Sequence, residues 1–181
     1  VEVGAEVSGR LIEVPVDFND PVKTGDLLAR IDPVPFQQEV TQARARLLSA
    51  QASLADAEAA AAEAASNRRR AEALAAEGLI SRQDLDARIA GAQRAEASIA
   101  AARAKVAEAT AASSAALIRQ GKTTILSPID GIVLDRRVEV GQTVTAGFQT
   151  PVLFSLARDL AELELQVAVD ALRRLRAEAE I

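Results

Sequence analysis

Few side chains in this sequence could carry out acid–base or covalent chemistry. There is no histidine and no cysteine, which excludes the usual zinc ligands, a thiol nucleophile and a histidine general base. The remaining candidates for a hydrolytic site are the carboxylates of Asp17, Asp20, Asp32 and Asp130. Each falls in a predicted turn, where Asp commonly accepts hydrogen bonds from nearby backbone N–H groups. We therefore expect no catalytic residue, no bound metal and no cofactor.

One acidic stretch, DFNDP at Asp17–Pro21, is faintly similar to part of a calcium-binding loop. It lacks the glycine at the sixth position and the glutamate at the twelfth that such a loop uses. We do not assign a calcium site to it.

A different kind of chemistry is suggested by the stretch RRRAEALAAEGLIS at Arg68–Ser81. Arginine offers charge-assisted hydrogen bonds to carbonyl groups and carboxylates. Leu74, Leu79 and Ile80 are bulky apolar residues in a region that is otherwise rich in alanine. An apolar spot bordered by arginine is typical of a protein contact surface. The alternative is a well-terminated helical hairpin with a solvated end.

The elements that hold this stretch are predicted by alternating spacings of four and three residues, which are typical of the seam of a coiled coil. The first seam comprises Phe36, Val40, Ala43, Leu47, Ala50, Leu54, Ala57, Ala61 and Ala64. The second comprises Leu85, Ile89, Ala92, Ala95, Ile99, Ala102, Val106, Ala109 and Ser113, with one slip between Ala92 and Ala95. Two such seams, joined by a short break, predict an antiparallel helical hairpin.

Residues 77–81 are predicted to be the turn of this hairpin. Gly78 suits the end of the first helix, and Ser81 suits the N-cap of the second. Asp84, three residues after Ser81, completes a pattern similar to a capping box. We expect the three arginines at 68–70 to lie in the last turns of the first helix, where cations interact favourably with the helix dipole.

The seam distinguishes among these arginines. Continued past Ala64, it reaches Arg68, Ala71 and Ala75 and leaves Arg70 and Leu74 on an adjacent face. Capping explains why the helix ends there, but it does not explain an arginine and a leucine outside the seam. We expect Arg68 and Arg69 to be solvated charges.

The segments on either side of the hairpin resemble each other. EVSGRLIEVPVDFNDPVKTG (residues 6–25) aligns without a gap on PIDGIVLDRRVEVGQTVTAG (residues 128–147). Gly9 then matches Gly131, and Gly25 matches Gly147. Each repeat ends in V-x-x-G, where glycine can adopt the positive φ of a tight turn. Two equal β halves around an insertion predict one small β-domain that is complete only when the halves meet.

Net charge, aromatic content and hydropathy argue against two further classes of protein, nucleic-acid binders and chains with a membrane span in this sequence. The net charge of −5 and the four aromatic residues, all phenylalanine, argue against a nucleic-acid binder. No apolar run approaches the roughly 20 residues that span a membrane. The strand-like beginning at Val1, without a signal peptide, leads us to expect a processed or trimmed chain.

Arg70, Leu74 and Ser81 have the spacing R-x3-L-x6-S, which resembles the hairpin-tip motif of the periplasmic adaptors of bacterial tripartite efflux pumps, also called membrane fusion proteins of the HlyD-like family. The resemblance covers nearly the whole chain and is closest to adaptors of ABC-type macrolide exporters. It implies an α+β fold. A split biotinyl/lipoyl-like β-domain (1–34 and 123–157) is interrupted by a helical hairpin (35–122) and followed by the beginning of a β-barrel domain (158–181).

The resemblance also implies a function without catalysis. Arg70, Leu74 and Ser81 would contact a TolC-like outer-membrane channel. The chain would form a homo-oligomeric ring, hexameric or built from trimers, and would work with an inner-membrane transporter of the ABC type or, as the alternative, the RND type. It would lie in the periplasm, associated with the inner membrane, and help to form a sealed export conduit for drugs or metabolites.

Two other interpretations are less consistent with the sequence. A lipoyl-type carrier domain needs a modified lysine at a hairpin between its halves, but Lys23, Lys105 and Lys122 lie in a predicted turn, in a helix and beside a helix end. A structural coiled-coil scaffold would explain the helices and leave the matched β halves unexplained.

Overall fold

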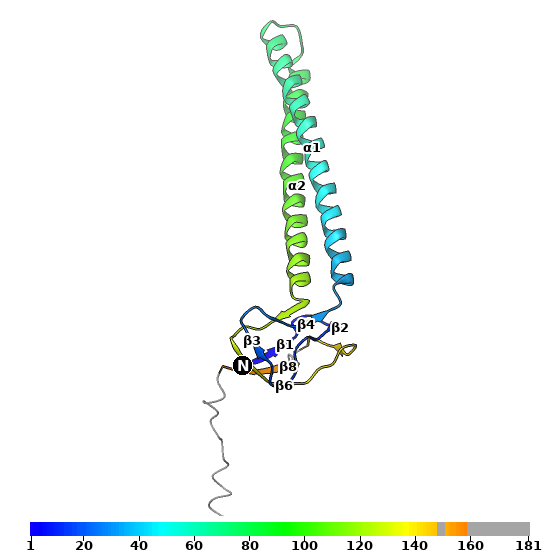
Figure 1. The fold of residues 1–181 in the computed structure, drawn as a ribbon. Helices are drawn as coiled ribbons and strands as arrows, with labels where there is room; N and C mark the ends of the chain where they lie inside the picture. Colours follow the sequence, from blue (N-terminus) through cyan, green and yellow to red (C-terminus); the bar gives the residue numbers. More distant parts are fainter. Residues whose placement is uncertain (148–150, 159–181) are drawn as a thin grey trace, which may run out of the picture. The chain divides into compact units, whose positions relative to one another are not determined.

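The computed structural model describes residues 1–147 and 151–158, which form two compact units (Figure 1). One unit is Asp32–Thr124, and the other joins Val1–Ile31 to the described residues from Ile125 onward. The expected beginning of a β-barrel at 158–181 lies, apart from Arg158, outside the described residues. No helix among the described residues has the length and apolar character needed to cross a membrane.

The helical unit is the predicted antiparallel hairpin, formed by α1 (Val34–Ala76) and α2 (Arg82–Gly121). Alanine dominates both helices and is the residue with the highest helix propensity. Pro33 and Pro35 lie at the start of α1, where proline is tolerated because the first N–H groups have no partner within the helix. The Asp32 carboxylate accepts a hydrogen bond from the Val34 N–H at 3.0 Å.

The burial pattern confirms both predicted seams. Every residue assigned to them from the sequence is buried or half-buried, whereas most residues between them are exposed. Alanines on the seam let the two helices approach closely, and Val40, Ala43 and Ala116 form a buried cluster. Two ion pairs join the helices outside the seam, Glu39 with Arg119 at 3.2 Å and Glu58 with Arg103 at 3.4 Å.

The β unit contains two four-stranded sheets. The first has the order β1-β8-β6-β3, and the second has the order β5-β4-β2-β7. Before the hairpin come β1 (Glu2–Gly4), β2 (Gly9–Glu13), β3 (Pro21–Val22) and β4 (Leu27–Ile31). After it come β5 (Thr124–Leu126), β6 (Gly131–Arg136), β7 (Thr143–Val144) and β8 (Val152–Ala157).

The two matched halves exchange strands, which confirms that the β-domain is complete only when both are present. β3 of the first half pairs with β6 of the second, and β7 of the second half pairs with β2 of the first. The core draws on both halves as well. Its fully buried large side chains are Leu11, Leu28, Ile31, Val133, Leu153, Phe154 and Leu156.

Aligned positions of the two halves share backbone constraints in the structure. Gly9 and Gly131 begin equivalent strands, and a Cβ atom added to either would come too close to its neighbour, 2.5 Å from the Ile31 side chain or 2.0 Å from the Ala157 carbonyl oxygen. Asn19 and Gly141, which are aligned in the repeat, both have positive φ, of 68° and 91°. Asn tolerates this conformation better than most residues other than glycine.

The expectation for the glycine that ends each repeat is correct for one half only. Gly25 has a φ of 94°. Gly147 does not have a positive φ, so that part of the prediction is wrong. In the second half the left-handed turn residue is Gly141, which precedes β7.

Candidate docking site at the hairpin tip

The hairpin tip, residues 77–81, begins with a regular helix stop. Glu77 is the C-cap of α1, and Gly78 follows with a φ of 74°. The Leu79 N–H donates to the Leu74 carbonyl at 2.9 Å, and the Gly78 N–H donates to the Ala75 carbonyl at 3.0 Å. This pair of bonds is the Schellman motif, in which the residues at the positions of Leu74 and Leu79 are often apolar. The helix stop therefore brings two leucines to the tip.

Ser81 is the N-cap of α2, as predicted. Its hydroxyl oxygen accepts a hydrogen bond from the Asp84 N–H at 3.1 Å. The other half of the pattern differs from a capping box, because the Asp84 carboxylate accepts from the Ser81 hydroxyl at 2.7 Å. Asp84 also places a negative charge in the first turn of α2, which is favourable for the helix dipole.

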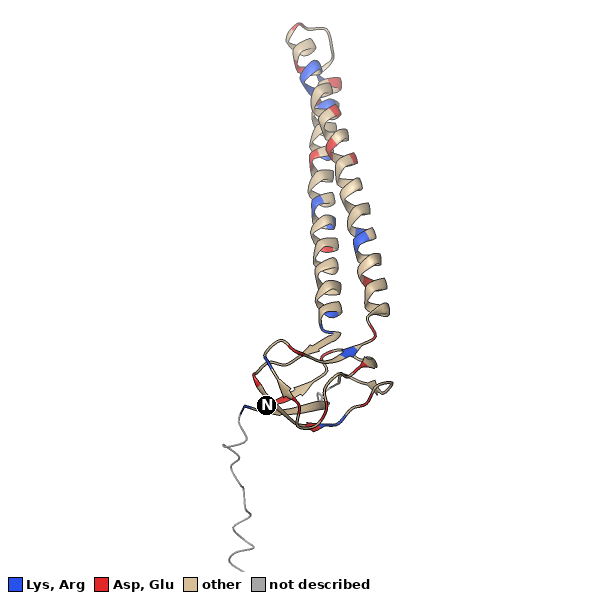
Figure 2. Cartoon of the chain, viewed as in Figure 1, with Lys and Arg blue, Asp and Glu red and all other residues tan. Residues whose placement is uncertain are grey.

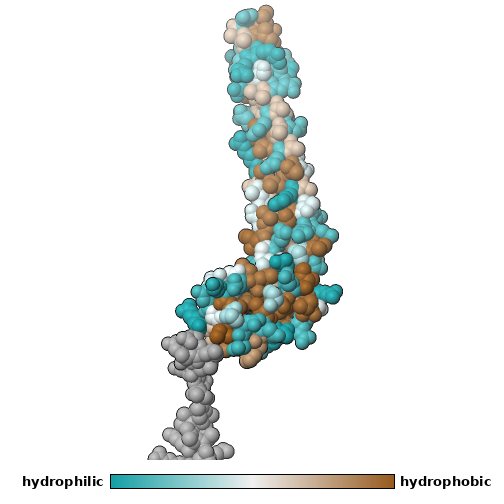
Figure 3. Space-filling view, viewed as in Figure 1, coloured by the Kyte–Doolittle hydropathy of each residue, from teal (hydrophilic) through white to brown (hydrophobic). Residues whose placement is uncertain are grey.

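Arg70 and Leu74 lie outside the seam, as the sequence predicts, and both are exposed. Arg70 Nη2 donates a hydrogen bond to the Asn67 side-chain oxygen at 2.5 Å, one helical turn earlier. Leu74 is 41% exposed and Leu79 is 65% exposed. The space-filling view shows apolar surface at this end of the hairpin, next to hydrophilic residues (Figure 3). Exposed leucines beside an arginine are the composition of a contact surface.

Both helices line a hollow of about 330 Å³ beside the tip, which we call the tip hollow. It is lined by Asn67, Arg70, Ala71 and Leu74 of α1, by Ile80 of the tip, and by Asp84 and Arg88 of α2. Two of the three predicted site residues, Arg70 and Leu74, therefore share one concave surface. Ser81 does not line it and is connected to it through Asp84.

Sequence reasoning placed Ile80 in the apolar spot but missed four other lining residues as members of the site, Asn67, Ala71, Asp84 and Arg88. Ala71 was considered only as a seam residue, and Asp84 only as part of a cap. A signal for Asn67 was available, because residues three apart on a helix are neighbours and Asn67 precedes Arg70 by three. Arg88 could not be found in this way, since its position depends on how the two helices align across the hairpin.

The expectations for the other arginines need correction. Arg68–Arg70 lie about two turns before the end of α1, and the last turn contains no basic residue, so the helix dipole does not explain them. Arg68 is half-buried on the seam rather than fully solvated, and its Nε lies 3.4 Å from the Glu72 carboxylate. Arg69 is exposed, as expected. Figure 2 shows basic and acidic positions together on the helices near the tip.

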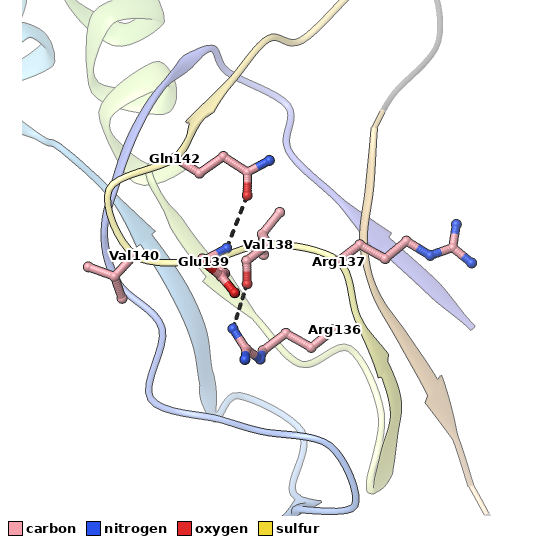
Figure 4. Close-up of a pocket in the computed structure, with 6 residues that line it drawn as sticks. All are labelled: Arg136, Arg137, Val138, Glu139, Val140 and Gln142. Atoms are coloured by element: carbon pink, nitrogen blue, oxygen red, sulfur yellow. Dashed lines mark hydrogen bonds between the residues drawn. The ribbon is translucent and has the colours of Figure 1, made fainter.

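The β unit has a larger hollow, of about 560 Å³, around the loop after β6 (Figure 4). Its arginines and glutamine are already bound within the chain. Arg136 donates to the Val138 carbonyl and to Asp17, Arg137 donates to Asp135, and the Gln142 side chain accepts from the Glu139 N–H. These contacts hold the loop in shape, so we do not assign a ligand to it.

The four candidate carboxylates accept hydrogen bonds from backbone N–H groups, as the turn interpretation predicts. Asp17 accepts from the Phe18 N–H at 2.8 Å, Asp20 from the Asp17 N–H at 2.7 Å, Asp130 from the Thr24 N–H at 2.6 Å, and Asp32 from the Val34 N–H at 3.0 Å. The Phe18 N–H, together with Arg136, lowers the pKa of Asp17. The hydrogen bond from the Thr24 N–H is the main cause of the lowered pKa of Asp130.

The lysines lie where the sequence places them, Lys23 in the turn after β3, Lys105 in α2 and Lys122 at the C-cap of α2. Across the described ranges, 1–147 and 151–158, no three acidic residues are grouped so that they could hold a metal ion.

Comparison with known proteins places the chain in a family. Residues 1–156 match the family model described as RND MFP, barrel-sandwich hybrid domain. The chain is 36% identical over 147 residues to multidrug resistance protein MdtA of Pectobacterium carotovorum, covering 81% of this chain and 32% of the relative. It is 35% identical over 169 residues to macrolide export protein MacA of Yersinia pestis, covering 93% of this chain and 45% of the relative.

A solved structure shares the fold. The crystal structure of MacA from Actinobacillus actinomycetemcomitans superposes with a TM-score of 0.82 at 34% identity, covering 87% of this chain and 48% of that one. The chain thus spans less than half the length of these relatives. The structure has two β halves that pair their strands and are separated in sequence by a helical hairpin, and the family model matches nearly the whole chain. The chain therefore belongs to the membrane fusion proteins, the adaptor family of efflux pumps.

Proposed function

We propose that this chain is part of a periplasmic adaptor that links an inner-membrane transporter to a TolC-like outer-membrane channel. The observation that carries this proposal is the tip of the hairpin. There, Arg70 and the exposed Leu74 share a hollow that both helices line, and Ser81 caps the helix beside it. In this proposal the tip acts by binding. Leu74 supplies apolar contact area, and Arg70 supplies charge-assisted hydrogen bonds.

The cargo of the assembly is a drug or a metabolite in this proposal. This proposal for the cargo rests on the family and on the names of two relatives, a multidrug resistance protein and a macrolide export protein. The adaptor would align and seal the conduit as a homo-oligomeric ring, hexameric or built from trimers. It would lie in the periplasm and be attached to the inner membrane.

We propose an ABC transporter as the inner-membrane partner, because the resemblance to macrolide-exporter adaptors is accompanied by a close structural match to one of them. A transporter of the RND type is the second candidate, since the matched family model is described by that name. Affinity purification of the full-length adaptor from its host, followed by mass spectrometry, distinguishes the two by the transporter that is recovered.

The docking role of the tip is tested by Arg70→Asp. A carboxylate in place of the guanidinium removes the donors and reverses the charge, and hydrogen bonds that involve a charged group contribute about 1.5–3 kcal/mol each. We expect binding of the full-length adaptor to the purified outer-membrane channel to weaken by about tenfold or more. Export of the pump's substrate from cells should fall with it.

Arg69→Asp is the matched control, because Arg69 is the exposed neighbour of Arg70 and does not line the tip hollow. It should bind and export as the parent does. Helix content, measured by circular dichroism, should be equal in both variants. Normal binding and export by a folded Arg70→Asp adaptor would refute the docking role.

A further inference from the structure

The tip hollow contains an arginine that the docking motif does not include. Arg88 of α2 is exposed and lines the hollow together with Arg70 and Leu74 of α1. Arg103 and Arg119, which also lie on α2, each form an ion pair with a glutamate of α1. No hydrogen bond or ion pair joins the Arg88 guanidinium to any residue that the structure describes. One arginine beside the tip thus has free donors.

No acidic residue of α1 lines the hollow beside Arg88, so α1 does not neutralise this positive charge. On the α1 side the polar lining is Asn67 and Arg70, which are neutral and positive. Asn67 accepts from Arg70 through a neutral amide oxygen, so it orients the guanidinium without cancelling its charge. The carboxylate of Asp84, the one acidic residue among the lining residues, accepts from the Ser81 hydroxyl. Two cations therefore border a hollow whose apolar lining includes Leu74 and Ile80.

We propose that the tip hollow as a whole is the docking pocket, that Arg88 is a second cation that contacts the partner, and that Asn67 is a positioning residue for Arg70. This inference rests on the proposed docking of the tip. By charge complementarity, the occupant is a turn of the outer-membrane channel that inserts an apolar side chain. The same turn presents carboxylates or helix C-terminal carbonyls to the two arginines, because both groups accept charge-assisted hydrogen bonds.

Arg88→Glu tests the second cation. Binding of the full-length adaptor to the purified channel should weaken by about tenfold or more, as for Arg70→Asp. Arg82→Glu is the matched control, since Arg82 is an exposed arginine of the first turn of α2 that does not line the hollow, and it should bind within about twofold of the parent. Arg88→Gln, which keeps helix propensity and removes the charge without reversing it, should also weaken binding and excludes misfolding as the cause.

The outcomes separate this inference from the proposed function. If Arg70→Asp weakens binding and both Arg88 variants bind normally, the inference is wrong and the docking role stands. If none of them changes binding, both are wrong. If Arg88→Glu changes only self-association of the adaptor, the pocket receives a second copy of this chain, and the channel is not its occupant.

A double-mutant cycle tests Asn67. Because Asn67 acts through Arg70, Asn67→Ala should weaken binding several-fold in the parent and have no effect when Arg70 is already alanine. A merely structural role would give the same loss in both backgrounds, and that result would overturn the positioning role. Asn67→Gln, which retains an amide oxygen, should recover part of the binding.

Discussion

The Ser81 hydroxyl has hydrogen bonds that limit what it can offer a partner. It donates its proton to Asp84 and accepts from the Asp84 N–H, and a hydroxyl has one donor and two acceptor positions. One acceptor position remains for an external donor. Within the proposed site, Ser81 is therefore a cap first, and its direct contribution to docking is limited to accepting a hydrogen bond.

Two substitutions separate these roles of Ser81. Ser81→Ala removes the cap and should destabilise the hairpin by about 1 kcal/mol, whereas Ser81→Thr keeps a capping hydroxyl and should cost much less. Thermal unfolding followed by circular dichroism measures both. If alanine and threonine leave the unfolding midpoint unchanged, the hydroxyl is not the stabilising cap that the distances indicate.

Sequence reasoning at this scale was most successful where a residue's position followed from the helix repeat. The seam alone predicted that Arg70 and Leu74 would lie outside it on an adjacent face, and in the structure both are exposed. It could not predict that Arg88 would line the same hollow, because that depends on the alignment of α2 along α1 and on the length of the turn between them. Arg68 was expected to be a solvated charge, but its position on the seam leaves the side chain half-buried, with a buried Nε atom 3.4 Å from the Glu72 carboxylate.

At the scale of the elements, the repeat in the β-domain was predictable and the pairing of its strands was not. Matched glycines and valines indicated two equivalent halves. The exchange of β3 and β7 between them is a long-range pairing that no local pattern encodes. The repeat gave the correct turn glycine in the first half and the wrong one in the second, because the left-handed conformation there occurs at Gly141, the equivalent of Asn19.

The close approach at Gly131 gives a prediction for this element. A Cβ atom there would lie 2.0 Å from the Ala157 carbonyl oxygen, so Gly131→Ala must displace β8 and should cost more than about 1 kcal/mol. Gly91→Ala in α2 is the control, since its Cβ would meet nothing within 4 Å, and it should stabilise the helix by about 0.5–1 kcal/mol. Chemical denaturation measures both changes. Equal effects of the two substitutions would show that the strands are not packed as described.

At the scale of the whole molecule, the chain has the features of a binding protein. The candidate carboxylates hold turns, the helices join along seams of small residues, and an apolar surface with free positive charge is found at the hairpin tip. The chain spans less than half the length of its relatives, so the contacts to an inner-membrane transporter belong to the proposal for the full protein. Docking through the tip is the part of the proposal that these residues can test by themselves.

Site-specific photo-crosslinking in cells is the most direct test of that docking. A photoreactive amino acid replaces Leu74 in the full-length adaptor, and Leu48, an exposed leucine of α1 that does not line the tip hollow, is the control position. Tip docking predicts a covalent adduct with the outer-membrane channel from position 74 and none from position 48. Absence of the channel adduct at position 74, or equal yields from the two positions in a pump that still exports, would contradict the proposed function.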